Sequence, residues 1–197
     1  MTTEEGYEAR QRIIAEATGL FIAGGYDGIS MREIAAAAGL SKPALYYHFK
    51  DKQALLLAIL TTNLEEISAI VNQGKKETGP VRQQVSWIFE TIMQRGPTIG
   101  GIIHLATQEL SHLDAQTRSG FSRLYQDGFI GNLAGLLAEG IARGELRPVD
   151  PHLATWALLG LVYPLLTTYP GGEPGDKTAI IHAILAIYFD GMAVKAI

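Results

Sequence analysis

The sequence predicts an all-α protein with an N-terminal three-helix domain and a larger helical domain behind it. Apolar residues recur at the 3.6-residue spacing of a helix almost throughout, and no stretch shows the alternation of a strand. Glycine and proline clusters break this periodicity at intervals, so we expect about nine helices. Residues 31–50 contain two short helical patterns joined at a single glycine, which is the layout of a helix-turn-helix.

The first helix should end in a glycine-rich turn at residues 24–28. Its buried stripe comprises Ile13, Ile14, Ala17, Leu20 and Phe21. Ser30 followed by Glu33 is a capping box, so a second helix should begin directly after the serine.

The turn of the helix-turn-helix is centred on Gly39, which can adopt a left-handed conformation that a side chain would resist. Ser41 is a suitable N-cap for the next helix, with Pro43 in its first turn. On that short helix Leu45 and Phe49 should point inward, which leaves the other side chains free to face outward.

Asp51 can cap the following helix. Helices are expected from there at about 52–72, 80–95, 98–111, 114–143, 150–169 and 177–194. Polar or Pro- and Gly-containing stretches separate them at residues 74–80, 96–97, 111–114, 144–148 and 170–175. We assign residues 1–52 to the first domain and 53–197 to the second.

Five glycines interrupt the pattern of residues 114–143, at positions 120, 128, 131, 135 and 140. Each costs an exposed helix about 1 kcal/mol relative to alanine. Close packing, room for a ligand, or a helix that is broken rather than continuous would each explain them.

The last two helices are apolar nearly all the way round over residues 156–166 and 179–189. Such helices must be covered on most sides. A homodimer whose subunits pair both helices in a four-helix bundle would cover them. The alternative is a monomer with a tightly wrapped C-terminal core.

Composition excludes several classes of site and partner. The 197 residues contain no cysteine, which removes disulfides and thiolate metal sites, and the net charge is −4. Residues 10–52 hold a small excess of lysine and arginine over acids, which favours positioned contacts rather than coating of DNA. With no apolar leader, and with a dense apolar run at 156–166 too short to span a bilayer, we expect a soluble cytoplasmic protein.

Residues 10–56 resemble the DNA-binding domain of the tetracycline-repressor (TetR) family of bacterial transcription regulators. The matching features are Phe21, the Gly25-Tyr26-Asp27-Gly28 turn, Ser30 to Ala35, Gly39, Leu45 to Phe49, and Lys52. Two departures are mild, since Ser30 stands where threonine is more usual and Gln53 where an acid often follows the lysine.

The resemblance implies a dimeric regulator, most often a repressor, that binds a palindromic operator in double-stranded DNA. The residues that it places at the DNA are Ser30, Arg32, Ser41, Lys42, Pro43, Ala44, Tyr46, Tyr47, His48 and Lys52. Lys42 is the best candidate for a base contact because lysine suits guanine O6 and N7, whereas Lys52 should meet a phosphate.

The resemblance also implies that the second domain binds a small hydrophobic or aromatic effector, whose identity the sequence does not give. Candidate lining residues are Trp87, His104, Gln108, Phe121, Tyr125, Trp156 and Tyr163. Aromatic residues at helical spacing are also typical of an ordinary core.

No metal, cofactor or catalytic motif is present in the sequence. Its histidines are scattered without metal-ligand spacing, and it has no nucleophile elbow and no phosphate loop. We therefore predict a regulator rather than an enzyme. The alternatives are a helical catalytic module, which would need a pair such as His104 with Glu109, and a module that docks a different chain.

Overall fold

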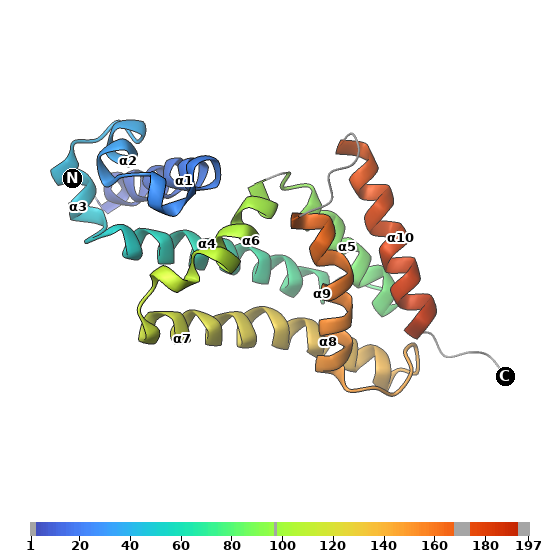
Figure 1. Ribbon diagram of the computed structural model, residues 1–197. Coiled ribbons are helices and arrows are strands. Elements are labelled where there is room, and N and C mark those ends of the chain that lie inside the picture. Colours follow the sequence, from blue (N-terminus) through green and yellow to red (C-terminus); the bar gives the residue numbers. More distant parts are fainter. Residues whose placement is uncertain (1–2, 97, 168–173, 193–197) are drawn as a thin grey trace. The chain divides into compact units, whose positions relative to one another are not determined.

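The computed structural model describes residues 3–96, 98–167 and 174–192, and this part of the chain is helical without a β-strand (Figure 1). The all-α prediction is confirmed. The helices are α1 (Thr3–Gly28), α2 (Met31–Ala37), α3 (Lys42–His48), α4 (Lys52–Gly74), α5 (Val81–Met93), α6 (Thr98–Gln108), η1 (Leu110–His112), α7 (Ala115–Leu124), η2 (Tyr125–Ile130), α8 (Gly131–Ala142), α9 (Pro151–Thr167) and α10 (Pro174–Met192).

The chain forms two compact units. The N-terminal unit contains Met1–Asn63 together with Gly101–Phe121, and the C-terminal unit contains Leu64–Gly100 and Ser122–Ile197. The segment Gly101–Phe121 therefore packs with the helix-turn-helix although it follows α5 in the chain. The division proposed from the sequence, 1–52 and 53–197, remains a prediction about domains.

The core of the N-terminal unit follows the predicted stripe of α1. Ile13, Ala17 and Phe21 are at most 1% exposed, whereas Leu20 is only partly buried. The helical path bends at Gly25, whose φ of 72° lies in the left-handed region. This bend produces the predicted glycine turn and leads the chain into α2.

The helix-turn-helix has the capping that the sequence predicts. The backbone N–H of Ser30 donates to Glu33 Oε2 at 2.8 Å, and the backbone N–H of Glu33 donates to Ser30 Oγ at 3.3 Å. Gly39 forms the turn with a φ of 66°. The N–H of Ala44 donates to Ser41 Oγ at 3.3 Å, which caps α3.

Arg12 on α1 links that helix to the helix-turn-helix. From the sequence we consider this arginine only as part of the charge balance. Arg12 Nε donates to the carbonyl of Ala38 at 2.9 Å, where α2 ends. Leu45 is fully buried and Phe49 is 3% exposed, so α3 is anchored from its inner face. Asp51 Oδ1 accepts from the N–H of Ala54 at 2.7 Å and caps α4 as predicted.

In the C-terminal unit, α8 packs on α5 and α9, and α10 packs on α5 and α9. A polar clamp fixes the start of α5, where Glu145 Oε2 accepts from the N–H of Val81 at 2.5 Å. The buried amide of Gln84 donates to the carbonyls of Lys75 and Glu77, at 3.2 and 2.9 Å. These bonds satisfy backbone groups at two helix ends that would otherwise be unpaired.

Burial raises the pKa of Glu145, but hydrogen bonds from Arg143 and from the Val81 N–H, together with the arginine's charge, outweigh it and lower the pKa overall. The carboxyl is therefore ionised in its role as a helix cap.

The predicted helix over 114–143 is one continuous path, but its middle, η2, is wound as a π-helix. Gly128 lies in this turn, where its carbonyl accepts from Asn132 Nδ2 at 2.5 Å. Close packing explains a second glycine, because a Cβ on Gly140 would lie 2.6 Å from Val81 Cγ1. Gly120 has no such neighbour within 4 Å.

The observed helix ends differ from the predicted ones by a few residues, which is ordinary fraying. The helix expected to reach residue 111 ends at Gln108 and continues as the short turn η1. The predicted segments at residues 97, 168–169, 170–173 and 193–194 lie outside the described residues. By length and composition alone, α4 is long and apolar enough to cross a membrane, as buried helices of globular proteins can be. Leu55, Leu56 and Ile59 on this helix are fully buried.

Candidate nucleic-acid interface

The outer face of α3 carries polar and aromatic side chains opposite its buried anchor. Tyr47 is 80% exposed and Tyr46 is 42% exposed. Lys42 Nζ lies 5.8 Å from the centre of the Tyr46 ring, so the tyrosine supports the lysine at the helix start. The Tyr47 and His48 rings meet edge to face at 5.3 Å. This face offers hydrogen-bond donors, a cation and flat apolar surface on one short helix.

The remaining predicted residues of α3 lie around this face. Ser41, Lys42 and Pro43 are exposed in the first turn, and Ala44 and His48 are partly buried. A helix of this kind reaches into the major groove with its N-terminal residues, where the groove's donor and acceptor pattern distinguishes all four base pairs.

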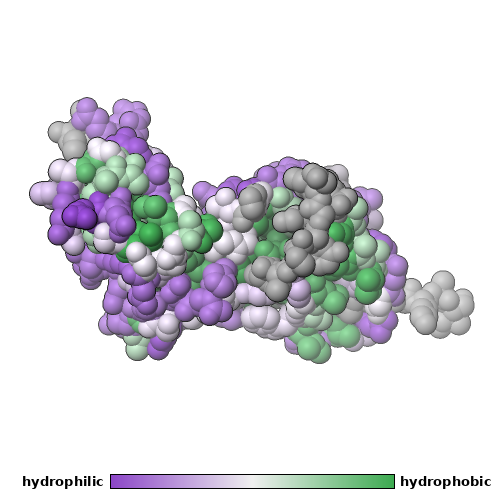
Figure 2. Space-filling view, turned by 45° about the horizontal axis from the view of Figure 1, so that its top comes forward, coloured by the Kyte–Doolittle hydropathy of each residue, from purple (hydrophilic) through white to green (hydrophobic). Residues whose placement is uncertain are grey.

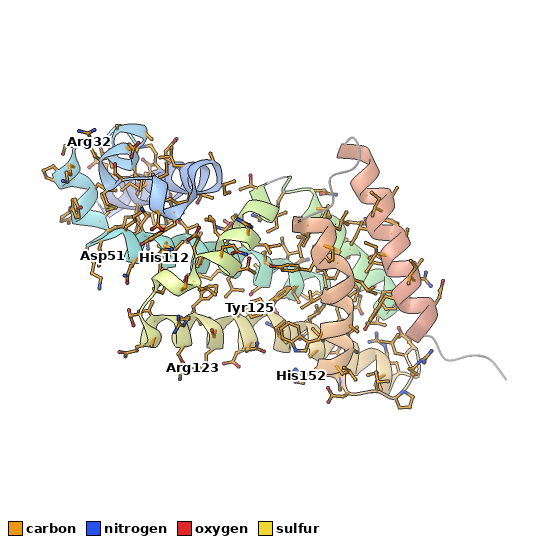
Figure 3. The ribbon with its side chains drawn as sticks, in the orientation of Figure 1. Arg32, Asp51, His112, Arg123, Tyr125 and His152 are labelled. Carbon is orange, nitrogen blue, oxygen red and sulfur yellow. The ribbon has the colours of Figure 1, made fainter. Side chains whose placement is uncertain are left out.

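The start of α2 carries two more of the predicted DNA-binding residues, Ser30 and Arg32. Arg32 is exposed in the first turn, as Figure 3 shows. Ser30 is exposed, but its hydroxyl donates to Glu33 Oε2 at 2.6 Å. Hydrogen bonds from the hydroxyl and the backbone N–H of Ser30 lower the pKa of Glu33, which keeps this cap ionised.

Lys52, in the first turn of α4, is partly buried beside aromatic rings. Its Nζ lies 4.2 Å from the centre of the Tyr26 ring and 5.7 Å from that of Phe21. Burial lowers the pKa of Lys52, and the negative charges of Asp27, Glu109 and Glu33 oppose that shift. The lysine is thus held in a defined place rather than extended into solvent.

The predicted effector-binding residues are divided between the two units. Trp87, Tyr125, Trp156 and Tyr163 belong to the C-terminal unit, whereas His104, Gln108 and Phe121 belong to the N-terminal unit. Within the C-terminal unit Tyr125 is partly buried in the first turn of η2 and its ring lies 5.7 Å from Phe129. Burial raises the pKa of Tyr125, and interaction with Tyr163 adds to the rise.

Exposed apolar side chains gather on the last two helices, where Figure 2 shows hydrophobic surface on the C-terminal unit. On α9, Leu153, Trp156 and Leu161 are between 41% and 64% exposed and recur at helical spacing. On α10, Ile187 is 67% exposed. Exposed large apolar side chains that gather on neighbouring helices are typical of an interaction surface.

Sequence reasoning does not find that Tyr26, the ring on which Lys52 rests, also packs against His112. The sequence places Tyr26 only in a turn, and His112 only among several scattered histidines. In the structure their rings lie 4.5 Å apart. No local signal pairs them, because the contact joins α1 to the segment that follows α6. Within residues 3–96, 98–167 and 174–192, no group of three His, Asp or Glu side chains is placed to hold a metal ion.

The sequence of this region matches a known family. Residues 13–59 fit the family model described as bacterial regulatory proteins, tetR family. The fatty acid metabolism regulator protein of Bacillus subtilis (strain 168) is 24% identical over 189 residues, a match that covers 93% of this chain and 95% of the relative.

Solved structures share the fold over nearly the whole chain. The regulator FadR from Bacillus subtilis in complex with stearoyl-CoA has a TM-score of 0.77 at 20% identity, covering 92% of this chain and 98% of that one. AibR in complex with isovaleryl coenzyme A and operator DNA has a TM-score of 0.72 at 22% identity, covering 92% and 98%. These similar proteins are regulators rather than enzymes, which agrees with the prediction that this chain is not an enzyme.

Proposed function

The chain is identified as a member of the tetR family of bacterial regulatory proteins, and on that premise we propose that it is a cytoplasmic repressor that binds a palindromic operator as a homodimer. The observation that carries the proposal is the outer face of α3. Its inner face is locked by Leu45 and Phe49, so Lys42, Tyr46 and Tyr47 are presented on a rigid support. Rigid presentation lets a short helix discriminate between base pairs.

Dimerisation would cover the exposed apolar stripes of α9 and α10. A two-fold dimer would place two copies of α3 about 34–36 Å apart, one turn of DNA, on half-sites of matching symmetry. Leu161→Glu should convert the dimer to monomer, measured as a halved mass by light scattering. His152→Glu, also on an exposed position of α9, is the matched control. A wild-type protein that is monomeric at every concentration would contradict the dimer.

The effector we propose is an acyl-coenzyme A thioester. Two proteins of the same fold have been solved with such ligands, and the C-terminal unit supplies the apolar and phenolic side chains of Trp87, Tyr125 and Tyr163. An apolar acyl chain suits such a lining, and a phenol can donate a hydrogen bond to a thioester carbonyl. Release of DNA requires that the ligand bind more tightly to the conformation that cannot hold the operator.

The test is fluorescence anisotropy with labelled DNA from directly upstream of the protein's own gene, with scrambled DNA as competitor. A specific regulator should bind with an affinity of about 10⁻⁸ M or tighter in the competitor's presence. Lys42→Ala should chiefly relax base preference, whereas Lys52→Ala should weaken all DNA sequences about equally. Unchanged binding by both variants would refute the proposed docking of α3.

Acyl-CoA thioesters of increasing chain length are then titrated into the complex, with free coenzyme A as the control. Selective loss of the complex with a thioester supports the effector class. Release of the DNA by coenzyme A alone would contradict it. So would a complex that no thioester dissociates.

A further inference from the structure

One cluster in the N-terminal unit joins the helix-turn-helix to the later segment Gly101–Phe121. Tyr26 is 6% exposed, and its ring is contacted by Lys52, His112 and Phe21, the last with ring centres 5.4 Å apart. The Lys52 ammonium lies 4.2 Å from its centre, and the His112 ring lies 4.5 Å from it with 33° between the planes. Figure 3 labels His112 together with Asp51, the residue that caps α4.

His112 is itself held in place by two carboxylates. Its Nε2 lies 3.0 Å from Glu109 Oε2 and 3.7 Å from Asp27 Oδ2. Glu109 precedes it on the same segment, whereas Asp27 is the neighbour of Tyr26 at the end of α1, beyond the bend at Gly25. The His112 imidazole therefore links the segment Gly101–Phe121 to the Tyr26 ring and to Asp27, the residue next to Tyr26.

The same carboxylates act on the lysine. Asp27 and Glu109 favour its charged form against the effect of burial, so an ammonium rests on the ring as a cation–π pair. A cation at this distance is attracted by the face of the aromatic ring. A ring that cannot tilt therefore restricts the ammonium to a smaller range of positions. The position of the ammonium thus depends on what fixes Tyr26.

We propose that His112 is a positioning residue for DNA binding: it fixes the ring of Tyr26, and that ring holds the Lys52 ammonium at the start of α4. The inference rests on the proposed function in one respect, the contact of Lys52 with a DNA phosphate. It gives the segment between α6 and α7 a part in operator binding although none of its residues is in the helix-turn-helix.

The first test needs no DNA. Ring current from Tyr26 should move the ε-methylene proton resonances of Lys52 upfield in the free protein, with the signal assigned by its loss in Lys52→Arg. His112→Ala should return the resonance toward that of an exposed lysine, and His112→Phe, which keeps a ring, should retain most of the shift. Ser111→Ala, an exposed neighbour, is the control. An unchanged resonance in a folded His112→Ala protein overturns the proposal.

The second test uses the operator. His112→Ala should weaken binding by about five- to tenfold, and the slope of log K against log salt should fall by about 0.9 for each phosphate that the protein no longer neutralises. In a Lys52→Ala background the same change should have no further effect, because the ammonium that His112 positions is already absent. A merely structural role would weaken binding with the salt slope unchanged, or act additively with Lys52→Ala, and either result overturns the proposal.

The two proposals fail in different ways. If the wild-type protein does not prefer any DNA sequence, the proposed function fails, and the resonance of Lys52 still decides whether His112 positions it. If operator binding is specific but His112→Ala leaves both the resonance and the salt slope unchanged, only the positioning role is wrong.

Discussion

Replacing Gly140 by alanine tests the packing of α8 on α5. The added Cβ would lie 2.6 Å from Val81 Cγ1 and 2.9 Å from Val81 Cβ, where ordinary contacts are 3.4 Å or longer. Val81 cannot retreat easily, because it is 1% exposed and its N–H is bonded to Glu145. The two helices must therefore separate by about 1 Å, which weakens the close packing of both.

The expected magnitude follows from two opposing effects. Overpacking of a filled core costs about 1–3 kcal/mol, and alanine gains about 1 kcal/mol over glycine in a helix. Since two short contacts fall on a fixed residue, we expect Gly140→Ala to lower the free energy of unfolding by about 1–2 kcal/mol. Gly120→Ala, with no neighbour within 4 Å, should raise it by about 0.5–1 kcal/mol.

Urea unfolding followed by circular dichroism measures both variants against the wild type. The pair Val81→Ala and Gly140→Ala should be less destabilising together than the sum of the two single changes, because the alanine at 81 removes the clashing methyl groups. A Gly140→Ala protein as stable as Gly120→Ala would refute the packing argument.

Three further predictions concern the helix ends. Gly39→Ala should destabilise the helix-turn-helix by about 1–2 kcal/mol, since a φ of 66° is strained for alanine. Gly19→Ala in α1, where an added Cβ meets no neighbour, should not lower the stability, and thermal unfolding of the two variants measures the difference. Ser30→Ala should cost about 1 kcal/mol by removing the cap of α2, and an equal melting temperature for variant and wild type would contradict it. The lowered pKa of Glu145 means that its stabilisation is complete above the unfolded pKa of about 4.3 and is lost as pH falls through the lower folded pKa. The stability difference between wild type and Glu145→Gln should therefore shrink below about pH 4, and a constant difference would argue against the ionised cap.

The helix-turn-helix was predictable because its determinants are local. A capping box within four residues, a glycine at the turn, and two anchors, one on the seven-residue helix α3 and one directly after it, are all visible in sequence order. The outer face of α3 then follows by elimination, since Leu45 and Phe49 must point inward. The sequence could not show that Lys52 rests on an aromatic ring, because that depends on where the bend at Gly25 places the end of α1, which carries Tyr26.

The remaining features depend on contacts between distant segments. The pairing of Tyr26 with His112, and of Gly140 with Val81, joins residues that share no local pattern. The π-helical turn over Tyr125–Ile130 inserts one extra residue into a helix whose periodicity otherwise continues. The glycines in this stretch indicate an irregularity, but three explanations fit them equally until the neighbours of each are known.

The most direct measurement of the central claim is a selection of random duplex DNA by the purified protein, followed by sequencing of the bound fraction. A dimer that reads DNA through α3 should enrich a two-fold symmetric sequence whose half-sites lie about 10 base pairs apart. The same selection with Lys42→Ala should yield a more degenerate sequence at one position of each half-site. Recovery of unenriched DNA by the folded wild-type protein would contradict the account.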